Sequence, residues 1–145
     1  MKNVTPRLIV RDADRALAWY QEHLGAELLE RYADSNLDDL VVHAALRIGG
    51  SIVSFAEESL DWGNPSPQHL DGSPVLLHLD VDDADAVGAR FTSGGAEVVI
   101  PIADRFYGKR EGRMRDPFGH LWIVSQVLEE LDAADIQGRM ERGEI

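Results

Sequence analysis

An internal repeat is the feature that most constrains how this chain can fold. The segment Val10–Asp14, with the sequence VRDAD, returns as VDDAD at Val81–Asp85. The segment Gly25–Leu28 (GAEL) returns as GAEV at Gly95–Val98, after a deletion of one residue. Two matches in the same order and at nearly the same spacing are hard to obtain by chance. The sequence therefore predicts two homologous halves.

Each half shows the pattern of one strand, one helix and three further strands. Apolar residues alternate just before each repeated segment, which is typical of a half-buried strand. Asp12 and Asp83 stand where an N-cap carboxylate accepts from free helix amides, and Gly25 and Gly94 stand where a helix ends. The further strands are predicted at residues 26–31, 41–48 and 51–56, and again at 96–100, 110–115 and 120–127.

The fold class predicted from this pattern is α+β, with paired βαβββ modules. We expect the first module at residues 1–66, a linker at 67–71, the second module at 72–128, and a C-terminal helix and tail at 129–145, all within one structural domain. Asp132 is placed to cap the terminal helix, which we expect to run to about Met140.

Composition narrows the function classes. The chain has 145 residues, a formal net charge of −12 and no cysteine. That charge argues against binding nucleic acid or an anionic membrane through the overall field. The lack of cysteine excludes disulfides and thiolate metal sites, and no apolar run is long enough for a transmembrane helix. We expect a cytoplasmic protein.

The motifs resemble those of the vicinal oxygen chelate superfamily, in its PhnB-like glyoxalase and bleomycin-resistance branch. The resemblance spans about residues 3–140, nearly the whole chain. The motifs that carry it are Val4–Pro6 with Leu8–Val10, Tyr20, Gly25–Glu27, His43-Ala44 with Leu46–Gly49, Gly112-Arg113, Arg115–His120 and Trp122. The resemblance implies that the two modules form a cleft between curled mixed sheets.

In active members of that superfamily, His and Glu side chains in the cleft usually hold a divalent metal. The resemblance places the first ligand of each half seven residues before the capping Asp, and the Glu seven residues after the Asp of the Asp-Pro-x-Gly turn. These positions carry Thr5, Leu76 and Ile123, with Val53 as the repeat mate of Ile123. None of these side chains is a usual ligand, so we expect no metal and no cofactor.

Strand alternation predicts which side chains face the cleft. Two arginines and two histidines among them would make the face locally cationic, which favours an anionic or carbonyl-bearing ligand. Alternatively, the arginines pair with neighbouring carboxylates and only solvate a rim. The same alternation places Val42 and Trp122 on the opposite, helix-covered face. The expected ligand-binding residues are Thr5, Arg7, His43, Arg47, Leu76, His78 and Ile123, together with Phe106 and Tyr107 in a loop that the resemblance places over the cleft.

Three functional hypotheses follow. The first is a metal-free protein that binds a small organic molecule, with sequestration of an antibiotic or metabolite as one role. The second is a metal-free lyase or isomerase that uses His78 and Tyr107, the candidate catalytic residues, for proton transfer. The third is a metal-dependent lyase, isomerase or dioxygenase, if the ligand positions are misassigned.

The expected partners are a small-molecule ligand and a second copy of the chain. We expect a homodimer because Trp19, Tyr20 and Phe91, with the apolar strands, exceed what one small core covers.

Overall fold

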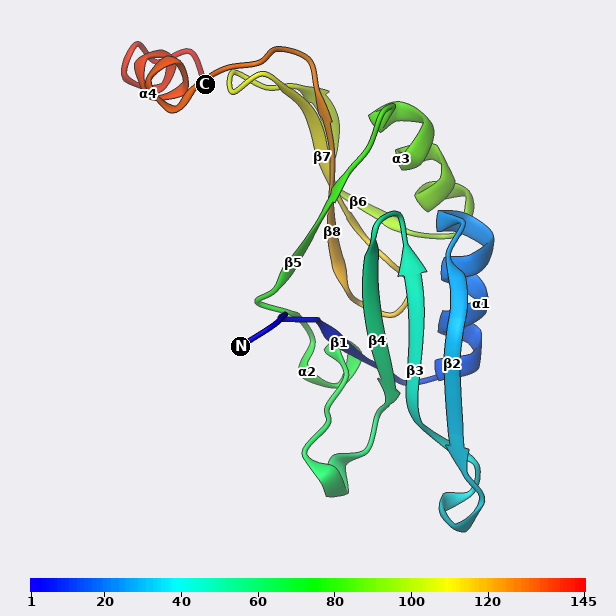
Figure 1. The fold of residues 1–145 in the computed structure, drawn as a ribbon. Helices are drawn as coiled ribbons and strands as arrows, with labels where there is room; N and C mark the ends of the chain where they lie inside the picture. The colour runs from blue at the N-terminus through cyan, green and yellow to red at the C-terminus, as the bar shows by residue number, and fades with distance from the viewer. The chain divides into compact units, whose positions relative to one another are not determined.

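The computed structural model describes residues 1–145, and they form two compact units. Unit 1 contains residues 1–74 together with 118–120, and unit 2 contains residues 75–117 and 121–145. Each unit contains one four-stranded sheet, and the two sheets can be followed in Figure 1. None of the helices is long and apolar enough to span a membrane.

Unit 1 is a βαβββ module followed by two short helical turns. Its sheet has the order β1-β4-β3-β2, in which β1 is parallel to β4 and the other pairs are antiparallel. The elements are β1 (Arg7–Val10), α1 (Ala13–Leu24), β2 (Glu27–Asp34), η1 (Ser35–Leu37), β3 (Leu40–Ile48), β4 (Ser51–Glu57), η2 (Leu60–Trp62) and α2 (Pro67–Leu70).

Unit 2 repeats the same module. Its sheet has the equivalent order β5-β8-β7-β6, again with one parallel pair, β5 and β8. The elements are β5 (Leu76–Asp80), α3 (Ala84–Ser93), β6 (Glu97–Asp104), β7 (Lys109–Arg115), β8 (Leu121–Val127) and α4 (Ala133–Glu141). The predicted α+β fold of paired βαβββ modules is confirmed.

The helix starts follow the local sequence signals. The Asp12 carboxylate accepts from the Arg15 amide at 3.1 Å, and the Asp83 carboxylate accepts from the Ala86 amide at 3.0 Å. Asp132 begins the terminal helix within a reciprocal capping box, as predicted. Each cap satisfies amides that have no partner inside the helix, so these three helices begin where the sequence indicates.

One face of each sheet is covered by a helix of the same unit. The core of each unit lies between that helix and its sheet. In unit 1 the fully buried residues include Tyr20 on α1 and Phe55 on β4, with ring centroids 5.3 Å apart. In unit 2, Phe91 on α3 lies 6.0 Å from Trp122 on β8, which is 3% exposed. The core position predicted for Trp122 is confirmed. The opposite face of each sheet is called the open face below.

The structure corrects one prediction about this core. Val42 was expected on the helix-covered face, but Val41 is buried there at 2% exposure. The cause is a β-bulge, because His43 pairs with Tyr32 and Val41 pairs with the next residue of β2, which leaves Val42 as the extra residue. An extra residue shifts the side-chain alternation of β3 by one position.

The basis of the dimer prediction is also corrected. Trp19, Tyr20 and Phe91 were expected to lie partly exposed, yet they are 8%, 0% and 0% exposed. In unit 1, the Phe118 ring supplies the missing cover, with its centroid 6.3 Å from that of Trp19 and 6.0 Å from that of Tyr20. The homodimer stays a prediction, without these three residues as its reason.

Candidate functional site

The unit 1 candidates Arg7 and His43 meet on the open face. Arg7 Nη2 donates to His43 Nδ1 at 3.0 Å, and His43 Nε2 lies 2.8 Å from a carboxylate oxygen of Glu30. A donor facing Nδ1 requires that nitrogen to be unprotonated, so we assign the proton to Nε2, which donates to Glu30. The Tyr32 ring stacks on the His43 ring at 5.6 Å. This arrangement holds the His43 ring between Arg7 and Glu30.

The other two unit 1 candidates have simpler surroundings. Arg47 lies in an ion pair with Glu27, with 3.4 Å between Nε and a carboxylate oxygen, and its side chain is 47% exposed. This is the rim arrangement given above as the alternative to ligand contact. Thr5 is exposed and precedes β1.

The repeat mate of Ile123 is Ser54, so the assignment of Val53 is wrong. Arg7 pairs with Ser54 across the first sheet, and His78, the repeat mate of Arg7, pairs with Ile123 across the second. Val53 instead pairs with Leu46 on the helix-covered face and is 6% exposed. The error arose because the repeated glycines show only one deletion in the second module. A second residue is missing from that module, between its helix and its last strand.

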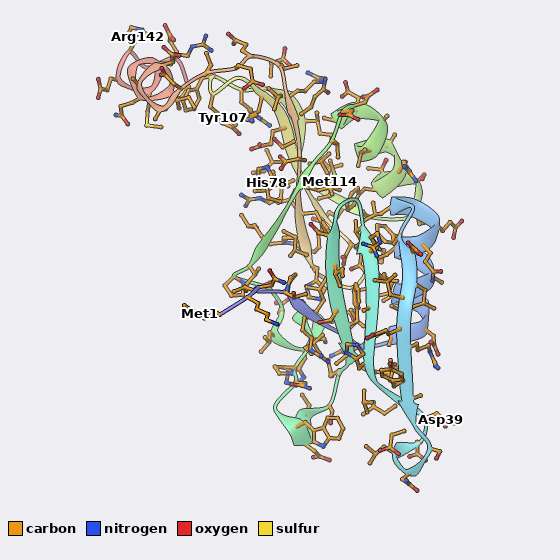
Figure 2. All side chains as sticks on the ribbon, in the orientation of Figure 1. Met1, Asp39, His78, Tyr107, Met114 and Arg142 are labelled. Carbon is orange, nitrogen blue, oxygen red and sulfur yellow. The ribbon has the colours of Figure 1, made fainter.

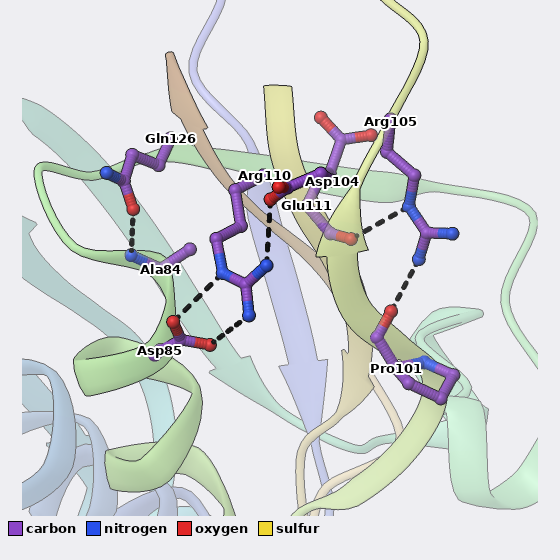
Figure 3. Close-up of polar contacts among 8 residues, drawn as sticks. All are labelled: Ala84, Asp85, Pro101, Asp104, Arg105, Arg110, Glu111 and Gln126. Atoms are coloured by element: carbon purple, nitrogen blue, oxygen red, sulfur yellow. Dashed lines mark hydrogen bonds and ion pairs between the residues drawn. The ribbon is translucent and has the colours of Figure 1, made fainter. Parts of the chain in front are cut away.

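A pair of helix contacts shows the same correspondence. The Ala13 amide donates to the Glu57 side chain at 2.8 Å, and the Ala84 amide donates to the Gln126 side chain at 2.9 Å. Ala84 is the repeat mate of Ala13. Gln126 and Glu57 are therefore equivalent, and they follow Ile123 and Ser54 by the same number of positions. The second contact is drawn in Figure 3.

The corrected positions do not fit a divalent metal. Thr5, Ser54, Leu76 and Ile123 offer two hydroxyls and two hydrocarbon side chains, and the Ser54 hydroxyl already donates to the Pro6 carbonyl at 3.1 Å. Neither unit brings together three or more His, Asp or Glu side chains in a metal-binding group. A stable divalent site needs about three such donors, and these four positions do not provide them.

Unit 2 places His78 and Leu76 on β5, both on the open face. His78 is labelled in Figure 2, and its Nε2 lies 3.1 Å from a carboxylate oxygen of Asp80 on the same strand. Its neighbour across the sheet is Ile123 on β8. Leu76 is 39% exposed at the start of the strand. His78 therefore borders Ile123, while its ring is turned toward Asp80.

A pocket of about 240 Å³ opens on this face of unit 2. Tyr107 and Ile123, both predicted as ligand-binding residues, line it, whereas Phe106, His78 and Leu76 are not among the lining residues. The residues that line the pocket are Ile100, Arg105, Tyr107, Glu111, Gly112, Arg113 and Ile123.

A tight turn between β6 and β7 positions Arg105 and Tyr107. The Arg105 amide donates to the Lys109 carbonyl at 2.8 Å, and the Gly108 amide donates to the Arg105 carbonyl at 3.1 Å. Gly108 has φ 81°, a conformation that favours glycine. The Phe106 ring packs edge-on against the Tyr107 ring, with centroids 5.1 Å apart. Phe106 thus supports Tyr107 within this turn.

The Arg105 guanidinium is anchored by backbone oxygens. Its Nε donates to the Glu111 carbonyl at 3.1 Å and its Nη2 donates to the Pro101 carbonyl at 2.5 Å, as Figure 3 shows. Both partners are uncharged carbonyls, so the positive charge of Arg105 is held in place without being neutralised by them.

Tyr107 and Glu111 form a short hydrogen bond within the pocket lining. The Tyr107 hydroxyl donates to a carboxylate oxygen of Glu111 at 2.5 Å. Burial, followed by this hydrogen bond, raises the pKa of the Tyr107 phenol to about 12. A phenol with that pKa keeps its proton near neutral pH, so it is a hydrogen-bond donor rather than a well-matched acid or base.

This pKa gives a spectroscopic prediction. We expect tyrosinate absorbance to show an ionisation near pH 12 that is lost in Tyr107→Phe and shifts to lower pH in Glu111→Gln, because a neutral amide stabilises the phenol less than a carboxylate. The stability contributed by the neutral phenol is complete below its ordinary pKa of about 10 and is lost as the pH rises through 12. The measurement is the difference titration of wild type against each variant.

Tyr32→Phe is the control for that titration, because Tyr32 is 57% exposed and lies on unit 1. It should leave the difference assigned to Tyr107 in place. A Tyr107→Phe protein whose absorbance still rose as in wild type near pH 12 would show that the assignment is wrong.

Sequence reasoning missed Arg105, Glu111 and Arg113 as pocket residues. For two of them a signal was present, since Gly112 and Met114 read as one face of the predicted strand at 110–115. Glu111 and Arg113 must then share the other face, and the structure pairs them with Ser125 and Ile123. Arg105 lies in a turn, where alternation gives no direction for a side chain.

A family model and a curated relative both match most of the chain. The model of the Glyoxalase/Bleomycin resistance protein/Dioxygenase superfamily matches residues 3–124. An uncharacterised protein of Mycobacterium bovis is 36% identical over 140 residues, covering 94% of this chain and 91% of that protein.

Solved structures are similar over most of the chain. The crystal structure of TioX from Micromonospora sp. ML1 is 30% identical, with a TM-score of 0.67, and covers 88% of this chain and 100% of that one. The fosfomycin resistance protein FosX from Listeria monocytogenes is 19% identical, with a TM-score of 0.66, and covers 90% of this chain and 96% of that one. At 19% identity, the second similarity concerns the fold alone.

Proposed function

The chain belongs to the Glyoxalase/Bleomycin resistance protein/Dioxygenase superfamily, and on that premise we propose that it binds a small organic molecule in the unit 2 pocket without a bound metal. The observation that carries the proposal is the lining of this pocket. Ile100, Gly112 and Ile123 provide apolar surface, and the side chains of Arg105, Tyr107, Glu111 and Arg113 provide polar groups. Apolar walls with a few fixed polar groups are typical of ligand pockets.

Binding rather than catalysis is the function that the contacts favour. Tyr107 keeps its proton near neutral pH, and Glu111 accepts that proton in a hydrogen bond. His78, the other catalytic candidate, is directed to Asp80. Sequestration of a metabolite or antibiotic is the role that fits such a site, and a lyase or isomerase is the competing function.

The test is a screen of neutral, anionic and cationic small organic molecules by ligand-observed NMR. Ile123→Trp should abolish binding of the hits, because the larger side chain fills a pocket of about 240 Å³. Ile52→Trp is the matched control, since Ile52 is an exposed residue on the open face of unit 1, outside the pocket.

We expect hits that bind wild type and Ile52→Trp equally and that lose binding in Ile123→Trp. A screen without hits, or hits that bind Ile123→Trp as well as wild type, would contradict the proposed site. Thermal unfolding of both variants checks that each is folded under the screening conditions.

A further inference from the structure

Two buried side-chain polar atoms lack a hydrogen-bond partner, and both lie on the open face of unit 2. They are Arg113 Nε and Ser125 Oγ. Arg113 on β7 pairs with Ile123, and Ser125 on β8 pairs with Glu111, so each is the neighbour of a pocket residue. Most buried polar groups in folded proteins are hydrogen-bonded, and an unpaired donor needs an explanation. Of these two residues, Arg113 lines the pocket and Ser125 does not, so the unpaired Nε of Arg113 is the atom considered below.

The charges around Arg113 are unequal. The ion pairs of the β7 arginines involve Arg110 and Arg115, and those two residues do not line the pocket. Arg105 is held by two carbonyls, and the one carboxylate of the lining, Glu111, accepts from Tyr107. The lining thus carries two guanidinium groups against one carboxylate, which leaves one positive charge in excess.

We propose that this pocket selects small organic monoanions, and that Arg113 binds a carboxylate through Nε and one Nη. The inference rests on the proposed function and names its ligand class. A guanidinium presents parallel N–H groups that match the two oxygens of a carboxylate, and the unpaired Nε provides one of them. The carboxylate neutralises the excess charge of the lining.

The rest of the ligand must be small and apolar. A dianion would bring a second negative charge near Glu111, which disfavours phosphate esters. Ile100 and Ile123 provide the apolar contacts. The volume of about 240 Å³ lies below the range of about 300–1,000 Å³ that is typical for drug-sized ligands, so a compact ring or short chain fits.

Acids paired with their neutral amides test the charge requirement. The probes are benzoate, phenylacetate and cyclohexanecarboxylate, each compared by calorimetry or NMR titration with its primary amide. We expect at least one acid to bind wild type at least tenfold more tightly than its amide. Arg113→Met should remove that preference, because methionine keeps an unbranched apolar side chain and lacks the guanidinium.

Arg115→Met is the matched control. Arg115 lies two residues further along the same face of β7 but pairs with Glu97 and does not line the pocket. It should keep the preference for the acid. In wild type, the Arg113 Nε–H resonance should also move when the acid binds and stay in place with the amide.

The failures of the two proposals are distinguishable. If none of the three acids binds, or if the amides bind as tightly as the acids, or if Arg113→Met keeps the preference, the anion inference is overturned. The proposed function still stands in those cases when the screen gives hits that Ile123→Trp abolishes. A screen without such hits overturns the binding function itself.

Discussion

Replacing Gly112 with alanine is expected to lower the free energy of unfolding by about 2 kcal/mol, because the site has no space for a methyl group. A Cβ at this position would lie 2.7 Å from the Ile100 carbonyl oxygen and 2.8 Å from the Ile102 amide nitrogen. Both are backbone atoms of the neighbouring strand β6, so no side-chain rotation relieves the contact. The two strands must separate locally, which also distorts the pocket that Gly112 lines.

Urea denaturation measures this effect, and Gly50→Ala is the matched control. Gly50 lies in the turn between β3 and β4, and a Cβ there meets no atom within 4 Å. We expect that control to change the free energy of unfolding by less than about 0.5 kcal/mol. If Gly112→Ala lowered the free energy of unfolding no more than Gly50→Ala does, Gly112 would not be crowded by the backbone of β6.

The largest expected loss of stability is that of Phe118→Ala, at about 3–5 kcal/mol. Phe118 is 2% exposed and belongs to unit 1, where its ring contacts Trp19 and Tyr20. The Arg15 guanidinium also lies 5.6 Å from the ring centroid. Removing the ring leaves a cavity beside two aromatic residues of α1, and rigid rings cannot collapse to fill it.

Leu60→Ala provides the comparison, because Leu60 is 55% exposed in the same unit. It should change stability by less than about 0.5 kcal/mol. Near-ultraviolet circular dichroism, which reports the packing of Trp19, should lose intensity in Phe118→Ala only. A Phe118→Ala protein as stable as wild type would mean that the ring is not part of this core.

Local signals accounted for most of the fold. The carboxylates of Asp12, Asp83 and Asp132 cap helices because an N-cap acts on amides two or three residues away, within reach of a short sequence pattern. Strand alternation found the strands, and the repeat showed that the second half has the same elements as the first.

The errors came from properties that depend on pairing between distant strands. The bulge at Val42 and the equivalence of Ser54 with Ile123 both appear only once partners across the sheet are known. A sequence repeat marks equivalent helices, but it does not count residues deleted between a helix and the last strand.

The lining of the candidate pocket was predictable in part. Ile123 and Tyr107, two of the expected ligand-binding residues, line it, and the alternation around Gly112 contained the information that places Glu111 and Arg113 on the same face as Ile123. The anchoring of Arg105 by the Pro101 and Glu111 carbonyls was not predictable, because it depends on the backbone path of a turn.

The membership of Phe118 in unit 1 has a consequence for synthesis on the ribosome. The residues that complete the unit 1 core, 118–120, are made only after the whole stretch 75–117, which belongs to unit 2. At about 5–20 residues per second, translation needs roughly 2–9 s to cover that stretch. During this delay the nascent chain lacks the Phe118 ring that packs beside Trp19 and Tyr20, so part of the apolar surface of these two residues stays uncovered until Phe118 emerges.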